Sequence, residues 1–176
     1  YSDGIKLFLR IKSFISLSDI PPHALSMFAD CFARESDLDT AILLLDMLHV
    51  SHPRDVETSC KLSNFLIQSG QLIKAKEVLE STNNFRVNDP NILTQLAIVE
   101  SELGNYIVAE DFHKKLINSY GQHFLSNYNY ALFLSMLGRE DESLNLLKVC
   151  LRLVPNAPEA LAEINKIKMR SDSILA

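Results

Sequence analysis

The chain has 176 residues, of which 47% are apolar and 22% are charged, and it contains only five glycines and six prolines. This composition excludes a disordered or low-complexity chain, and the length suits one domain or an array of about five small units. The net charge of −5 at pH 7 excludes a protein that works chiefly by binding phosphate backbones, which requires clustered Lys and Arg. We therefore expect an ordered protein with no nucleic-acid partner.

The first predicted element is a helix over residues 4–17, in the most apolar part of the chain. Lys6, Arg10 and Lys12 interrupt it, and it is too short to cross a bilayer. It also lacks the continuous apolar core and the cleavage site of a signal peptide. We expect no direct membrane insertion. The first residue is Tyr and not Met, which favours a fragment or processed form of a longer protein.

The central part of the chain repeats with a period of 34 residues. Gly70, Gly104 and Gly138 are each 34 residues apart, and Ser36 stands one period earlier. Units that begin fourteen residues before these markers cover residues 22–55, 56–89, 90–123 and 124–157. Each unit is predicted to hold two antiparallel helices, with the marker residue in the left-handed conformation that ends the first helix.

Two columns of small residues run through the four units. The eighth position is occupied by Ala29, Ser63, Ala97 and Ala131, and the twentieth by Ala41, Ala75, Ala109 and Ser143. Small side chains at these points allow two helix backbones to approach closely. The apolar positions around them recur at helical spacing, so neighbouring hairpins are expected to stack and share one core.

This pattern resembles the tetratricopeptide repeat, and the match covers residues 22–157 in four copies without insertion. The resemblance implies an all-α, right-handed superhelical solenoid of antiparallel helix pairs, with four full repeats and flanking helices. The chain departs from the family pattern at the fourth position, where Ser59 and Asn127 replace apolar residues, and at Ser36.

The same register extends to both ends of the chain. Residues 1–19 become the second helix of a partial upstream repeat, with Leu7, Ile11 and Phe14 in its core columns. This placement leaves an apolar set under-covered and open to contact with a second copy, namely Ile5, Phe8, Leu9 and Ile15. Residues 158–176 become a C-terminal capping helix.

The resemblance also implies a binding surface, because first helices line the concave groove in this family. Ten residues at the corresponding positions are predicted to bind a partner: Lys61, Asn64, Gln68, Asn91, Thr94, Gln95, Ile98, Tyr128, Asn129 and Leu132. Amide side chains both donate and accept hydrogen bonds, so this groove could hold an extended peptide backbone. A solvated polar surface without a ligand is the alternative.

Relatives that bind chaperone tails clamp a terminal carboxylate with Lys or Arg at set positions of the groove. The corresponding residues here are Cys60, Asn64, Gln95, Leu125 and Asn129. The basic groups are absent, so an acidic chaperone tail is not the expected ligand.

No nucleophile, phosphate-binding or metal-binding motif occurs in the sequence. His49 and His52 are expected at a solvated helix end, and Cys60 is the candidate reactive thiol of the groove. Glu100 and His113 occupy apolar columns of one unit, which suggests a hydrogen bond between them. We expect no enzyme activity, no cofactor and no metal.

The widely spaced Cys31, Cys60 and Cys150 favour reduced thiols and a cytoplasmic location. An exported or lipid-anchored form of a longer protein remains open. The predicted function is a protein-interaction scaffold or adaptor that binds a peptide or helix in its groove, by analogy in bacterial secretion or pilus assembly. The alternative is a homo-oligomeric structural protein that associates through its N-terminal helix, for example as a dimer.

Overall fold

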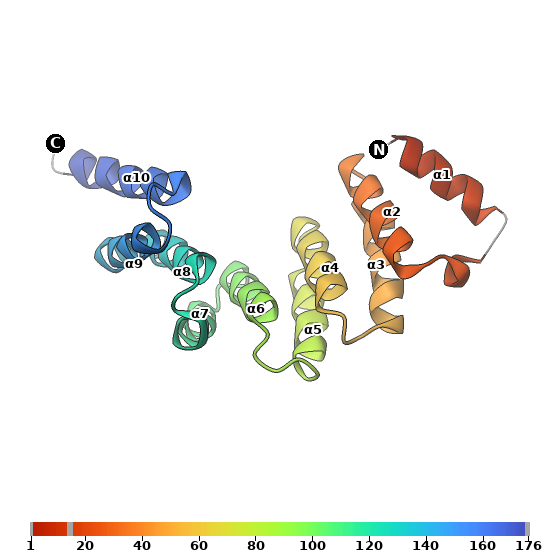
Figure 1. The fold of residues 1–176 in the computed structure, drawn as a ribbon, viewed down its shortest axis with the longest axis horizontal. Coiled ribbons are helices and arrows are strands. Elements are labelled where there is room, and N and C mark those ends of the chain that lie inside the picture. Colours follow the sequence, from red (N-terminus) through yellow and green to blue (C-terminus); the bar gives the residue numbers. More distant parts are fainter. Residues whose placement is uncertain (1, 14–15, 175–176) are drawn as a thin grey trace. The chain divides into compact units, whose positions relative to one another are not determined.

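The computed structural model describes residues 2–13 and 16–174, and the regular structure of these residues is entirely helical. This confirms the predicted all-α fold. In chain order the elements are α1 (Ser2–Lys12), the 3-10 helix η1 (Leu17–Asp19), α2 (Pro22–Arg34), α3 (Leu38–Ser51), α4 (Val56–Gln68), α5 (Leu72–Asn83), α6 (Pro90–Glu102), α7 (Tyr106–Tyr120), α8 (Phe124–Met136), α9 (Glu140–Leu153) and α10 (Pro158–Ile174) (Figure 1).

The chain forms two compact units, one up to Asn105 and the other from Tyr106 onward. In the first unit α2 pairs with α3 and α4 pairs with α5, and each hairpin packs against the next element. Figure 1 shows these helices stacked side by side, with α4 beside α6. In the second unit α8 and α9 form the hairpin, α7 packs on α8, and α10 covers α8 and α9.

Four tight turns end first helices in the same way. Gly70, Gly104 and Gly138 have φ angles of 77°, 79° and 73°, and Ser36 adopts the same left-handed conformation at 67°. In each turn the following residue donates its N–H to the carbonyl five residues earlier, as in Gln71 N to Leu66 O at 2.8 Å. This bond satisfies a carbonyl that the end of the helix would otherwise leave without a partner.

The helices also begin at identifiable residues. The Asp37, Asp55 and Asp89 carboxylates accept hydrogen bonds from backbone N–H groups in the first turns of α3, α4 and α6. Such caps satisfy N–H groups that have no partner within the helix. Pro22 and Pro90 stand in the first turn of α2 and α6, where proline fits a helix.

Both columns of small residues are completely buried. All eight side chains have 0% exposure: Ala29, Ala41, Ser63, Ala75, Ala97, Ala109, Ala131 and Ser143. In the second unit Ser143 Oγ of α9 donates to the Ala131 carbonyl of α8 at 2.8 Å. The two columns therefore meet inside this hairpin, at a point where a larger side chain would separate the helices.

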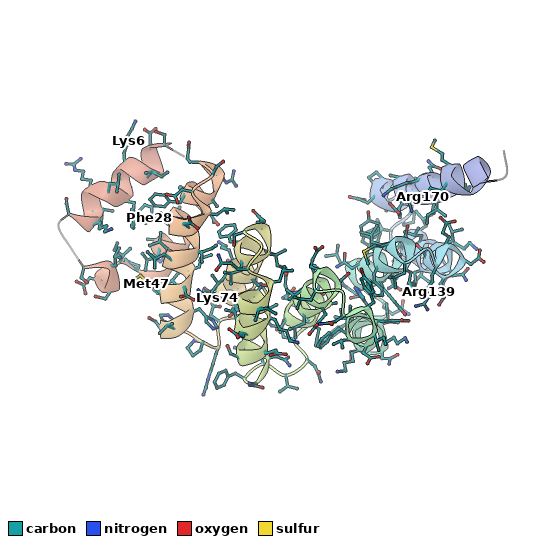
Figure 2. All side chains as sticks on the ribbon, turned by 180° about the vertical axis from the view of Figure 1, so that it is seen from behind. Lys6, Phe28, Met47, Lys74, Arg139 and Arg170 are labelled. Carbon is teal, nitrogen blue, oxygen red and sulfur yellow. The ribbon has the colours of Figure 1, made fainter. Side chains whose placement is uncertain are left out.

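The α1 helix packs on α2, but with a different face from the predicted one. Phe8 is only 3% exposed, and its ring lies 5.1 Å from Phe28 and 5.3 Å from Phe32. Figure 2 shows Phe28 of α2 on the side that faces α1. The expectation that Phe8 is under-covered is therefore wrong, because its ring fills the space between the two helices.

The face of α1 is rotated by about one residue relative to the predicted register. Leu7, predicted in the core, is 52% exposed, and Leu9 is 57% exposed. At Gly4 the backbone of α1 lies close to α2, since a Cβ there would lie 2.6 Å from Cys31 Sγ. Ile5 is half-buried, and Phe14 and Ile15 lie outside the described residues.

Candidate protein-binding surfaces

The first helices of the first unit present their predicted binding positions on one face. Lys61 of α4 crosses to α2, where its Nζ donates to Ser26 Oγ at 2.8 Å and to Asp30 Oδ2 at 3.0 Å. Ser26 and Asp30 stand one repeat period before Cys60 and Asn64, so all three residues of the bridge occupy groove positions of successive units as the resemblance assigns them. Because the bridge joins them directly, the α2 and α4 positions lie side by side. The Lys61 charge is already paired with a carboxylate.

Most of the predicted amides on this face are accessible. Asn64, Gln68 and Asn91 are exposed, whereas Thr94 and Gln95 are half-buried. Thr94 Oγ1 donates to the Pro90 carbonyl of its own helix at 2.7 Å. Gln95 Oε1 is buried without a hydrogen-bond partner among the described residues.

Three apolar or aromatic residues and one further amide complete the predicted set. Ile98 of α6 is partly exposed, and Tyr128, Asn129 and Leu132 of α8 are half-buried. The Tyr128 ring stacks on Phe124 at a centroid distance of 5.7 Å and an interplanar angle of 14°. The predicted residues thus lie on α4 and α6 in the first unit and on α8 in the second. Their role in binding stays a prediction.

The buried carboxylate of Glu100 finds its partners inside the first unit. Lys76 Nζ lies 2.7 Å from Glu100 Oε1, and Asn105 Nδ2 donates to Glu100 Oε2 at 2.7 Å. The hydrogen bond to Glu100 raises the pKa of Lys76, so the ammonium form persists. The predicted Glu100–His113 bond would join residues of the two units, and it stays a prediction.

His113 belongs to a polar and aromatic cluster of the second unit. Its ring stacks on Tyr130 at 5.2 Å and contacts Phe133 at 4.9 Å. Burial lowers the pKa of His113 to about 4, although the nearby Glu110 carboxylate acts in the opposite direction. The neutral ring is therefore the folded form at pH 7.

Glu110 anchors this cluster through several partners. Tyr130 Oη donates to it at 2.9 Å, Arg139 Nη1 lies at 2.9 Å, and Lys114 Nζ lies at 3.1 Å. Burial opposes ionisation of Glu110, but the hydrogen bonds from these groups outweigh it and lower the pKa to about 2. Burial and then Glu110 raise the pKa of Tyr130 to about 12. The cluster ties α7, α8 and the start of α9 together.

His49 is buried, which corrects the expectation of a solvated helix end. Its Nδ1 lies 3.1 Å from Ser59 Oγ, and its Nε2 lies 3.2 Å from Ser81 Oγ. Ser59 Oγ also lies 2.8 Å from Thr82 Oγ1. Burial lowers the pKa of His49, with Asp46 acting in the opposite direction. Ser59 has no exposed surface, so this Ser–His contact joins α3, α4 and α5 and is closed to a substrate.

Sequence reasoning missed this network, although two signals for it were visible. Ser59 stands in a column that is apolar in two of the other three units, and Thr82 stands in one that is apolar in all three. The second such departure, Asn127, is explained in the same way, because its Nδ2 donates to the Gly121 and His123 carbonyls at 2.8 and 2.9 Å. Polar residues at core positions thus mark buried hydrogen bonds here.

The reactive thiol expected at Cys60 is not supported. Cys60 is half-buried, and burial followed by the Asp89 and Asp55 carboxylates raises its pKa to about 12. The thiolate, which is the reactive form, is therefore disfavoured. Within the described part of the chain, no group of three or more His, Cys, Asp or Glu side chains could hold a metal ion.

Solved structures establish what this arrangement of helices is. The crystal structure of TTC0263, a thermophilic TPR protein of Thermus thermophilus, matches with a TM-score of 0.76 at 18% identity and covers 96% of both chains. The chain has the tetratricopeptide-repeat fold. MamA 41-end from Desulfovibrio magneticus RS-1 is also similar, with a TM-score of 0.66 at 13% identity over 86% of this chain and 85% of that one.

A MamA structure designated MSR-1 C2 matches with a TM-score of 0.60 at 21% identity, covering 88% of this chain and 89% of the other. At these identities the likeness concerns the tetratricopeptide-repeat fold alone. No protein-family profile matches the chain. No curated protein matches it either.

The first unit carries no cation at the carboxylate-clamp positions, which hold Cys60, Asn64 and Gln95. Among the residues that the structure describes, no helix combines the length and the apolar character that a membrane span needs.

Proposed function

We propose that the chain is a non-enzymatic scaffold or adaptor that binds a segment of another protein on the face of its first helices. The observation that carries this proposal is the Lys61 bridge to Ser26 and Asp30, which joins predicted groove positions of neighbouring first helices. Exposed amides at Asn64, Gln68 and Asn91 supply donors and acceptors that match a peptide backbone.

The ligand in this proposal is an extended or helical segment without a dominant acidic terminus. Lys61 is neutralised by Asp30 before any ligand arrives, so an anion would have to compete with an internal carboxylate. Exposed apolar residues at Met27 and Ile98 add contact area for side chains of the segment. An assembly role, as in secretion or pilus building, fits such a short array by analogy.

The test begins with affinity capture and mass spectrometry to identify a partner, followed by calorimetry with the purified partner. Asn64→Arg combined with Asn91→Arg places bulky cations on the proposed face and is expected to weaken binding at least tenfold. Asn145→Arg is the matched control, because Asn145 is an exposed asparagine on the second helix α9. If the double variant keeps its helical circular dichroism and binds with unchanged affinity, the binding site lies elsewhere.

A second candidate is self-association through α1, which the exposure of Leu7 and Leu9 favours. Phe8 takes no part in it, since it packs within the chain. Sedimentation velocity of the wild type and of the Leu7→Asp, Leu9→Asp variant tests this candidate. A concentration-dependent dimer that the variant abolishes supports it, whereas a monomeric wild type at all concentrations removes it.

A further inference from the structure

The α8 helix carries an apolar stripe that the second unit leaves partly uncovered. Leu125, Tyr128, Leu132 and Met136 are spaced by three, four and four residues, which places them on one side of a helix. Leu125 and Met136 are exposed, and Tyr128 and Leu132 are half-buried. We refer to these four residues as the α8 stripe.

Tyr128 holds a fixed position within the α8 stripe. Its ring stacks on Phe124 and packs against the core of Ala131, Leu147 and Cys150. The side chain is only half-buried, so part of it is accessible to a ligand. An ordered aromatic ring at an accessible site can attract a cation to its face.

The α10 helix packs on α8 beside Tyr128, whose side chain contacts the core cluster that includes Ala157 and Ala160, which flank Glu159 at the start of α10. Burial, and then the charges of Glu163 and Glu159, raise the pKa of the Tyr128 phenol. Glu163 is buried and already bonded, since Ser135 Oγ donates to it at 2.9 Å and Lys166 Nζ lies at 3.3 Å. Glu159 differs, because it is exposed in the first turn of α10 and pairs with no cation among the described residues.

We propose that the α8 stripe and Glu159 together bind a partner segment that presents apolar side chains and one Lys or Arg. The apolar side chains cover Leu125 and Leu132, and the cation lies against Tyr128 and Glu159. This inference rests on the proposed function and specifies the chemistry of its ligand. An acidic segment is disfavoured at this surface, because it would bring a like charge to Glu159.

The experiment selects ligands directly from a random library. Random 12-residue peptides displayed on phage are selected on the whole folded chain, and the enriched peptides are synthesised with a fluorescein label. Fluorescence anisotropy then gives their affinities for the wild type and the variants. We expect peptides that combine Leu, Ile or Phe with Lys or Arg.

Glu159→Lys is expected to weaken these peptides at least tenfold, and Leu125→Ser at least threefold. Asp141→Lys is the matched control, since Asp141 is also an acid in the first turn of a helix of this unit. Its effect should stay within twofold. Exchanging the selected cation for Glu in the peptide should abolish binding to the wild type and restore part of it to the Glu159→Lys variant.

Three outcomes overturn the inference: no peptide is enriched, the enriched peptides lack a cation, or Glu159→Lys leaves their affinity unchanged. Peptides that respond to Asn64→Arg and ignore Glu159→Lys would overturn this inference and leave the proposed function intact. A captured partner whose affinity responds to neither set of variants would contradict the proposed function itself.

Discussion

Glu100 and His113 show how single polar residues fit into apolar columns. The position of Glu100 holds Phe32, Leu66 and Leu134 in the other repeats. Glu100 is nevertheless 2% exposed, and its carboxylate is bonded on both oxygens. Such a group is tolerated only while it keeps its partners, because an unpaired buried charge is costly.

The partner of Glu100 provides a direct test. Lys76→Ala should lower the free energy of unfolding by about 1–3 kcal/mol, since it leaves a buried carboxylate with Asn105 alone. Lys74→Ala on the same helix is the control, because the Lys74–Asp46 pair spans 3.4 Å between partly exposed side chains and should contribute under about 1 kcal/mol. Urea unfolding measures both. Equal losses would show that burial of Glu100 carries no penalty.

His113 predicts a pH dependence of stability. Its pKa is about 4 in the folded protein against 6.5 for an unperturbed histidine, so the unfolded chain binds more protons between these values. Stability contributed by the neutral ring is present above pH 6.5 and falls as the pH drops toward 4, by about 3 kcal/mol at most.

Replacement of the ring checks this prediction. His113→Leu installs the residue found at this position in the other repeats. Its unfolding free energy should fall less than that of the wild type between pH 7 and pH 4.5, as measured by urea titration at each pH. The remaining slope includes His49, whose pKa is also lowered. Parallel pH profiles for both proteins would contradict the assignment.

At the scale of the element, the turns that follow α2, α4, α6 and α8 each contain one residue in the left-handed conformation. This residue is serine in the first turn and glycine in the other three. A left-handed φ costs a residue with a Cβ about 1–2 kcal/mol, and glycine much less. Ser36 at φ 67° bears this cost, whereas the three glycines do not. The sequence position of the turn was therefore predictable from the period, despite the missing glycine.

The first turn predicts a stabilising substitution. Ser36→Gly should raise the free energy of unfolding by about 0.5–1 kcal/mol, because relief of the left-handed strain exceeds the added freedom of the unfolded chain. Ser69→Gly serves as the control, since Ser69 has a φ of −86° in a comparable turn. It should not stabilise. Thermal unfolding followed by circular dichroism separates the two, and destabilisation by Ser36→Gly would refute the account.

At the scale of the whole molecule, the two columns of small residues are fully buried between closely packed helices in every repeat. Ser63 and Ser143 replace alanine at two of these fully buried points, yet their hydroxyls differ. Ser143 Oγ donates to the Ala131 carbonyl at 2.8 Å, whereas Ser63 Oγ has no partner among the described residues. The buried hydroxyl is thus satisfied in one repeat and unsatisfied in the other.

This contrast predicts that replacing serine by alanine changes the free energy of unfolding in opposite directions at the two positions. Ser63→Ala should stabilise the protein by about 1 kcal/mol, because it removes an unsatisfied buried hydroxyl. Ser143→Ala should destabilise it by a similar amount, because it removes a hydrogen bond and leaves a carbonyl with less bonding. Chemical denaturation of the two single variants decides the matter. The same sign for both would show that hydrogen bonding is not what distinguishes these columns.

The repeat period was sufficient to predict the helical fold, because small residues and turn markers act locally and recur four times. The period was insufficient for α1, where α2 is contacted by Phe8 and Gly4 and not by Leu7. A single helix has no second copy in the sequence from which its register could be fixed. Lys76–Glu100 and His49–Ser59 also escaped prediction. Such pairs depend on the side-chain rotamers that residues adopt where two helices pack together. These rotamers cannot be read from a single sequence. The binding role of the first-helix positions remains a prediction.

The outer side of α10 limits how the array could be lengthened by design. Pro158 opens a fifth period of 34 residues, and Ala160, Glu163 and Ile167 are buried against the preceding hairpin. Asn165 and Lys168 are exposed, at the eighth and eleventh positions of that period, where the earlier repeats carry small or mostly apolar side chains. A helix grafted onto this side would bury the Asn165 amide and the Lys168 ammonium group away from water. Both residues would need replacement before a further repeat could be added.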